Sequence, residues 1–596
     1  MHTSLAESCD SSFQQAMDDE INSLQESLLA LKARRNALSP ISRLPPEILA
    51  TIFSLLPPSA WVTKAGNLAR ICVAHVCRRW RETTLNHPRL WSDINFSKLT
   101  PDGMAEILAR TQRIPLHLEV DANRWRTGQF DTFVEQLEAH ISHIRYLSIS
   151  GHLHTSLNQV ISSVPTLESL SLSHEHHRYR LPHVNPVNLS SCIAPRLTSL
   201  ELVNCDISWE SPLLKGLRTL KICGPSADTR PGLQDWMDAL TEMPQLETLI
   251  LHSATPLALH AAPLLSQPSR TATLPSLTGF HISASAGDCA LALAHLVLPA
   301  LSWLHVDAES GEEDDVRLAI PYVARHVYER QDTEPLRSIL INDQRKRVKI
   351  VAWNMTVKAD APNTLFRASG PARLVFTAPC GSWNHEMANA IFDLLVTRLP
   401  VNSVSTLTTQ NRTRLSREFW LSHASRLPLL ERVLLVPTAL MAFRHMLAED
   451  APPDGPRLPL LTKLTLVGVT LTPITTLHLR NMLMKREQQG VPLEVLDLRT
   501  CVATDREIQF LREVVVDVQE PLAAGTMPME EPTLFDRNGG IGYCCNEVED
   551  DHDKLQPSYD ESINDQEEDA DEAEEEYSEL MEYNYYGYDL DAVCML

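Results

Sequence analysis

The stretch PTLESLSL, residues 165–172, decides the fold class, because the chain repeats its pattern. The phrase Pro-x-Leu-x-x-Leu-x-Leu returns at residues 195–202 and 244–251. Alternation within the phrase places its last two leucines on one face of a short strand. Looser copies keep three apolar positions, at Leu277/Phe280/Ile282, Leu301/Leu304/Val306, Leu430/Val433/Leu435, Leu461/Leu464/Leu466 and Leu493/Leu496/Leu498.

Successive copies start between 20 and 35 residues apart, and the residues between them often have helical spacing, as at Met387, Ile391 and Leu394. A strand and a helix about every thirty residues predict an α/β protein whose parallel strands stack into a curved solenoid. The pattern is degenerate over residues 337–429, where only Leu374/Phe376 and Val404/Leu407 hint at strands. Distorted repeats, an insertion or a break between two arcs would each explain this stretch.

Two copies of the phrase extend to a cysteine, Cys205 and Cys501, at the position where leucine-rich repeats carry one. Residues 98–516 therefore resemble an irregular leucine-rich-repeat solenoid of the kind that often follows an F-box. An ordinary α/β solenoid would also fit this periodicity.

Residues 1–38 are predicted to form a coiled-coil-like helix that ends at Ser39-Pro40. We expect this helix to pack back on the next domain, since a seam of about three heptads makes only a marginal two-stranded coil. A homodimer through this helix is the alternative. The heptad seam consists of Met17, Ile21, Leu24, Leu28, Leu31 and Leu38, with Arg35 between the last two.

The next block, residues 39–97, is short, helical and contains tryptophan. Residues 44–47, Leu-Pro-Pro-Glu, predict a helix start, because proline suits the first turn and an acidic side chain complements the helix dipole. Pro57-Pro58 ends that helix. A second helix is predicted with Leu68, Ile71, Cys72, Val76 and Trp80 on its apolar side and Arg78, Arg79 and Arg81 at its end.

Residues 44–53 (LPPEILATIF), 76–81 (VCRRWR) and 88–91 (PRLW) occur in the order of the F-box-like domain, which this block closely resembles in its form frequent in fungal proteins. The resemblance implies docking on the Skp-type adaptor of a cullin–RING ubiquitin ligase. Some of the apolar residues must instead form the core of so small a domain. The resemblance assigns adaptor binding to Leu44, Pro45, Ile48, Leu49, Ile52, Phe53, Val76, Cys77 and Trp80.

The net charge of −24 belongs almost wholly to residues 517–596, which hold 25 acidic and two basic residues and carry −23. The remaining chain carries −1, and residues 39–97 carry +4. Charge repulsion and scarce apolar residues predict a disordered, solubilising acidic tail; a short binding segment around Tyr583–Tyr588 is the alternative. A further hypothesis is that the tail folds over Arg78, Arg79 and Arg81 and weakens adaptor docking.

Patterns typical of catalysis and cofactor binding are missing from the sequence: it holds no Walker loop, GxGxxG or GxSxG. The run His385-Glu-Met-Ala-Asn389 lacks the second histidine of a zinc-protease helix, and the histidines of residues 174–177 are expected to be solvated. The basic run at residues 345–349 is too short for a nucleic-acid interface. We therefore expect no enzyme activity, no cofactor, no metal and no nucleic-acid partner.

The first twenty residues have neither the basic start nor the apolar core of a targeting peptide, and no apolar run approaches the ~18 residues of a membrane span. The 12 cysteines show no disulfide or metal-site spacing. These features predict a cytoplasmic or nuclear protein without a membrane partner.

The combined interpretation is a non-catalytic substrate receptor of a Skp–cullin–F-box-type ubiquitin ligase. Its expected parts are an N-terminal helix (1–38), an all-helical F-box-like domain (39–97), a leucine-rich-repeat solenoid (98–516) and an acidic tail (517–596). The F-box-like helices would bind the adaptor, and the repeats would bind a target protein that the sequence does not identify. The alternative is a leucine-rich-repeat scaffold that acts outside any ubiquitin ligase.

Overall fold

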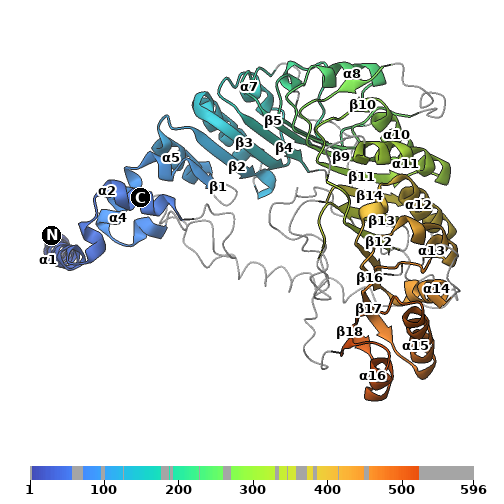
Figure 1. Ribbon diagram of the computed structural model, residues 1–596. Helices are drawn as coiled ribbons and strands as arrows, with labels where there is room; N and C mark the ends of the chain where they lie inside the picture. The colour runs from blue at the N-terminus through green and yellow to red at the C-terminus, as the bar shows by residue number, and fades with distance from the viewer. Residues whose placement is uncertain are drawn as a thin grey trace, which may run out of the picture. The chain divides into compact units, whose positions relative to one another are not determined.

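In the computed structural model the chain forms two compact units (Figure 1). The first unit consists of Met1–Ser171, Ile193–Arg196 and Cys545–Leu596, and the second consists of Leu172–Cys192 and Leu197–Cys544. The expected acidic tail falls almost wholly outside the residues that the structure describes. These are residues 3–56, 72–95, 101–124, 127–175, 187, 189, 192–226, 229–258, 270–328, 334–344, 347–357, 372–379, 385–411, 413, 415–448 and 455–521.

The first unit begins with the predicted helix, α1 (Thr3–Ala37), which ends just before Ser39-Pro40. Its last turn is tied to the next element, because the Ser42 hydroxyl donates to the Asn36 carbonyl at 2.7 Å. The six apolar residues of the seam are 46–80% exposed, so the expectation that α1 packs back on the following domain is wrong. The helical repeat predicted the element correctly but carried no information about what covers it.

Short helices follow α1: η1 (Pro40–Arg43), α2 (Pro46–Ser54), η3 (Val73–His75), α4 (Arg78–Leu85) and η4 (Pro88–Leu90). Three strands then pair in parallel in the order β1 (Asp93–Asn95), β2 (Leu116–Asp121) and β3 (Ile144–Gly151). Their connections are α5 (Pro101–Thr111) and α6 (Thr127–His140), and α7 (Leu157–Ile161) follows β3. The quoted phrases did not include these strands, although β2 buries alternate residues as a half-buried strand does.

The second unit is a mixed α/β region with a large parallel sheet. Five strands of this sheet pair in sequence order: β5 (Ser199–Val203), β6 (Thr219–Cys223), β7 (Thr248–His252), β9 (Gly279–Ser285) and β11 (Trp303–Ser310). β4 (Ser169–His174) lies at the boundary of the two units, and β8 (Ala272–Thr273) pairs with β10 (Leu296–Val297).

Later strands of this unit are β12 (Ser338–Gln344), β13 (Arg347–Trp353), β14 (Leu374–Pro379), β15 (Thr406–Asn411), β16 (Arg432–Leu435), β17 (Lys463–Thr470), β18 (Val495–Val502) and β19 (Asp517–Gln519). From β15 to β19 each strand pairs in parallel with the next. Helices α8 (Leu233–Thr241), α10 (Ala286–Ala294), α11 (Glu313–Tyr328), α12 (His385–Arg398), α13 (Arg417–His423), α14 (Pro437–Ala448), α15 (Pro473–Gln488) and α16 (Asp505–Arg512) connect the strands. Figure 1 shows α10 to α15 on one side of the sheet.

The repeated leucines form the core between this sheet and its helices, as their period of two predicted. Leu200 stands opposite Leu220, Leu220 opposite Leu249, and Leu249 opposite Phe280 in successive strands. All four side chains are fully buried. The same register places the phrases side by side, so their apolar side chains line one continuous face of the sheet.

The degenerate stretch is an insertion within a continuous sheet. β14, and not β12, pairs in parallel with β11. β13 is antiparallel to both β14 and β12, and β12 pairs in parallel with β15. The strand order in space is therefore β11, β14, β13, β12 and β15. After α11 the chain passes over two positions to form β12, returns through β13 and β14, and passes forward again through α12 to β15. This order explains why the spacing of the phrase fails here although the pairing does not.

Candidate functional surfaces

The Leu-Pro edge of the helical domain is held by an arginine from the second motif. Leu44 and Pro45 are extended residues between η1 and α2. The Arg79 guanidinium donates hydrogen bonds to the carbonyl oxygens of Ser42 and Leu44. These charge-assisted bonds tie the edge to the second motif, which carries Arg79. Sequence spacing indicated an arginine cluster there but not this contact.

The buried side of α2 consists of Leu49, Ala50 and Phe53. The Phe53 ring lies 4.8 Å from the ring of Trp80, with an angle of 51° between their planes. Leu49 and Phe53 are therefore packing residues in this structure, and the half-buried Trp80 covers them from α4. Some of the residues that the resemblance assigned to the adaptor thus also serve as the core of the domain.

The opposite side of α2 is an exposed apolar row. Ile48, Ile52 and Leu55 are spaced by four and three residues, which places them on one helix face, and they are 47%, 40% and 79% exposed. Pro45 at the helix entry is exposed as well. We call these four residues the α2 row. Leu55 was not among the predicted residues, although its helical spacing from Ile48 pointed to it.

Three other predicted residues come from the Val76–Trp80 segment or the Leu-Pro edge. Val76 is exposed, whereas Cys77 and Leu44 are half-buried. A single helix through Val76 and Trp80 was expected, but Cys77 is extended (φ −160°, ψ 165°) and α4 begins only at Arg78. The apolar spacing continues across this break, so periodicity did not reveal it. Leu68 and Ile71 lie outside the described residues.

The third motif packs against α4. Trp91 is buried, and its indole N–H donates to the Thr84 carbonyl at 2.8 Å. Thr84 in turn donates to the Trp80 carbonyl at 2.8 Å within α4. The Arg110 guanidinium lies 5.0 Å from the centre of the Trp91 ring, which is a cation–π distance. The three motifs that are separated in sequence are therefore joined by direct contacts.

Residues 41–97 match the F-box-like family, so the chain contains an F-box-like domain at the position that the motifs indicated. A search among curated proteins finds no significant match. The domain supports binding to a Skp-type adaptor, and F-box proteins are typically non-catalytic receptors.

In the second unit, the sheet face that turns away from the leucine core carries polar residues in register. Lys221 contacts Glu201 at 2.6 Å, and Arg347 pairs with Asp307. Arg347 and Lys349 of the basic run thus lie on strand β13, where Arg347 forms an ion pair within the sheet.

A histidine row crosses the same face through β7, β9 and β11. The rings of His252 and His281 are 4.5 Å apart, and those of His281 and His305 are stacked at 4.0 Å. Burial lowers the pKa of all three, and the pKa of His305 falls to about 3. The three imidazoles are therefore neutral at pH 7. His281 and His305 are stacked, the His252 ring stands edge-on to His281 at 70°, and His252 and His281 are buried.

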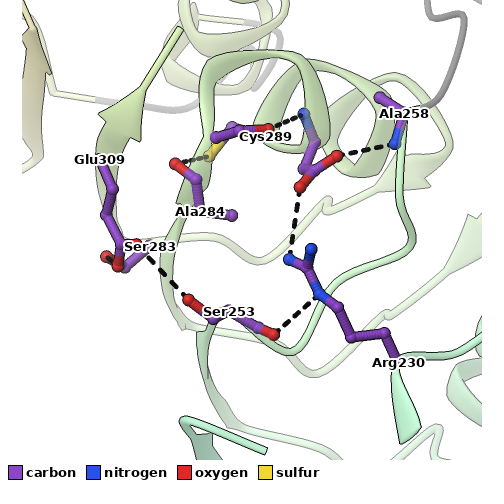
Figure 2. Close-up of polar contacts among 9 residues, drawn as sticks. Arg230, Ser253, Ala258, Ser283, Ala284, Cys289 and Glu309 are labelled. Carbon is purple, nitrogen blue, oxygen red and sulfur yellow. Dashed lines mark hydrogen bonds and ion pairs between the residues drawn. The ribbon is translucent and has the colours of Figure 1, made fainter. Parts of the chain in front are cut away.

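The carboxyl ends of these strands hold a polar network, shown in Figure 2. The Asp288 carboxylate of α10 receives the Ala258 N–H at 2.7 Å and pairs with Arg230 at 3.3 Å. Arg230 also donates to the Ser253 carbonyl at 3.0 Å. The network ties α10 to the loop after β7, so its arrangement serves packing.

Figure 2 also shows a thiol beside this network. Cys289 donates to the Ala284 carbonyl, and burial raises its pKa. A protonated thiol is a poor nucleophile. This cysteine is a packing residue at the start of α10.

Several smaller sequence features also have a position. Asn389, which replaces the second histidine of the zinc-protease pattern, accepts the Ser416 N–H at 3.2 Å. His176, His177 and most of the acidic tail lie outside the described residues. Within the part of the chain that is described, no three His, Cys, Asp or Glu side chains gather as metal ligands, and no helix has the length and apolarity to cross a bilayer.

Proposed function

We propose that the protein is a substrate-recognition subunit of an SCF-type ubiquitin ligase. The observation that carries the proposal is the α2 row, an exposed apolar face next to a Leu-Pro edge held by Arg79 in an F-box-like domain. Exposed apolar patches on small domains mark interaction sites. The adaptor would cover this row and connect the protein to a cullin.

We also propose that the second unit is an irregular leucine-rich-repeat solenoid that binds the target. The part of this unit that we assign to the target is the less buried charge on the sheet face opposite the leucine core, such as Glu201 and Arg347. The protein would then contribute proximity, by raising the local concentration of target lysines near the ubiquitin-charged partner. No chemical step is assigned to its own side chains.

Adaptor binding is tested with the full-length Ile48→Ser/Ile52→Ser variant and a purified Skp-type adaptor. Both isoleucines are exposed, so the variant retains the core of the domain. Loss of two apolar contacts should raise Kd by about tenfold or more. Ile474→Ser is the matched control, because Ile474 is an exposed isoleucine of α15 in the other unit. Equal affinity of all three proteins, or no binding by the wild type, contradicts the proposal.

Target binding is tested by affinity capture and mass spectrometry with the cullin inhibited. The receptor role is supported by a captured protein whose cellular level rises when the cullin is inhibited. Capture of that protein should also be lost when charged residues of the proposed target-binding face are substituted. Captured proteins whose levels stay constant favour a scaffold outside any ubiquitin ligase.

A further inference from the structure

The exposed seam of α1 forms an apolar stripe without cover from the described part of its own unit. Its residues from Met17 to Leu31 are 46–64% exposed. Such a stripe on a helix needs a partner helix, because heptad-spaced leucines pack as knobs into the holes of a facing helix. The charges that flank the stripe indicate what that partner is.

The acidic and basic residues of α1 are separated along the helix. Asp18 and Glu20 flank the start of the seam, and Lys32 and Arg34 flank its end, with neutral Gln25 and Ser27 between them. All six side chains are exposed. In heptad terms each of them borders the apolar stripe, at the positions where coiled coils place the charges that set partner and orientation.

We propose that α1 pairs with α1 of a second copy of this chain in an antiparallel coiled coil. Antiparallel pairing places Ile21 opposite Leu31 and Leu24 opposite Leu28 of the second copy. The same register brings Asp18 next to Lys32 and Glu20 next to Arg34. By symmetry each contact occurs twice, so four ion pairs border the core and the neutral middle faces itself.

The outermost layers also favour this orientation. Arg35 occupies a core position of the seam, between Leu31 and Leu38. A parallel pair would place two Arg35 side chains face to face in the core, which repel each other. Antiparallel pairing places Arg35 over Met17, where its apolar stem packs and its guanidinium reaches the acidic flank.

The length of the helix agrees with this register. Because α1 ends at Ala37, the antiparallel overlap extends over residues 15–37, a stretch of roughly 34 Å. In a parallel pair Glu20 would instead border neutral Gln25 of the partner, and Lys32 would border neutral Ser27, so no ion pair would flank the core. Self-complementarity through charge is therefore specific to one orientation and one partner, the second copy.

The test measures self-association of the full-length protein by sedimentation equilibrium over a concentration series. The wild type should dimerise reversibly. Leu24→Asp/Leu28→Asp, at the centre of the seam, should abolish the dimer. Leu29→Asp is the matched control, since Leu29 is equally exposed but lies off the seam. A monomeric wild type, or an equal loss with Leu29→Asp, overturns the proposal.

Charge exchange tests the orientation. Asp18→Lys/Glu20→Lys and Lys32→Glu/Arg34→Glu should each weaken self-association by about a hundredfold at low salt, because four attractions become repulsions. Mixing the two variants should restore the affinity, since every acidic flank then meets a basic one. Circular dichroism checks that both remain helical. Failure of the mixture to recover overturns antiparallel pairing, whatever the outcome of the adaptor experiments.

Discussion

Arg79→Met should loosen the Leu-Pro edge without removing the core of the domain. The substitution keeps the apolar stem and removes the bonds to the carbonyls of Ser42 and Leu44. Hydrogen bonds from a charged donor contribute about 1.5–3 kcal/mol each when buried, and partial exposure of Arg79 reduces this, so we expect about 2 kcal/mol for the pair. That free energy equals roughly a 30-fold change in a local opening equilibrium.

The assay is amide hydrogen exchange, because the Leu44 N–H donates to the Ile41 carbonyl at 3.2 Å and reports on the edge. Its exchange should accelerate by up to about 30-fold, and adaptor affinity should fall by a similar factor at most. Arg78→Met is the control, since Arg78 is the exposed neighbour with the same charge. Wild-type exchange together with wild-type affinity in Arg79→Met would refute the reasoning. Lost affinity with unchanged exchange would instead make Arg79 a direct adaptor contact.

Three further outcomes are expected. Asp288→Ala should lower the free energy of unfolding by about 3 kcal/mol, because it leaves the buried Arg230 charge unpaired, and urea denaturation measures this loss. Burial lowers the folded-state pKa of His305 to about 3, so its contribution to the free energy of unfolding is complete above the unfolded pKa near 6.5 and is lost as the pH falls toward 3. The free energy of unfolding from urea denaturation should therefore be lower at pH 5.5 than at pH 7.5, and His305→Gln should reduce this difference. Deletion of residues after 520 should tighten adaptor binding more at low than at high salt, and equal affinities at both would exclude masking by the acidic segment.

The structure shows where the three arginines of that masking hypothesis stand. The Arg79 guanidinium donates to the carbonyl oxygens of the Leu-Pro edge, and Arg81 donates to the Ala74 carbonyl at 3.1 Å. Arg78 and Arg81 are exposed, and Arg79 is half-buried. Because hydrogen bonds to neutral carbonyls leave the guanidinium charge in place, all three arginines contribute to the basic surface that masking requires.

Period-two apolar residues predicted strands β5, β7, β9, β11, β16, β17 and β18 of the second unit, because a strand buried on one face constrains every second residue. Helical spacing at Met387, Ile391 and Leu394 likewise predicted α12. The apolar period therefore predicts which face of an element is buried, most reliably where the neighbouring strand has the same period.

The order of the strands in the sheet could not be predicted from the sequence. β12 and β14 lie on either side of β13 because pairing partners, not spacing, decide the order, and no local pattern states which strand comes next. The break in the helix at Cys77 could not be predicted either, because the apolar spacing continues through it without interruption. Contacts across more than 30 residues, such as Arg79 with Leu44, depend on the assembled domain.

The joint between α1 and the F-box-like domain has a consequence for valency. Only Leu38 and Ser39 separate α1 from η1, and the Ser42 hydroxyl donates to the Asn36 carbonyl across this short connection. In the antiparallel pair the two Ala37 residues would stand at opposite ends, roughly 33 Å apart along the axis. A parallel pair would crowd two adaptors onto one end. If the F-box-like domain binds an adaptor as proposed, the antiparallel pair would place the two adaptors at opposite ends of one particle, which would favour targets that are themselves multimeric.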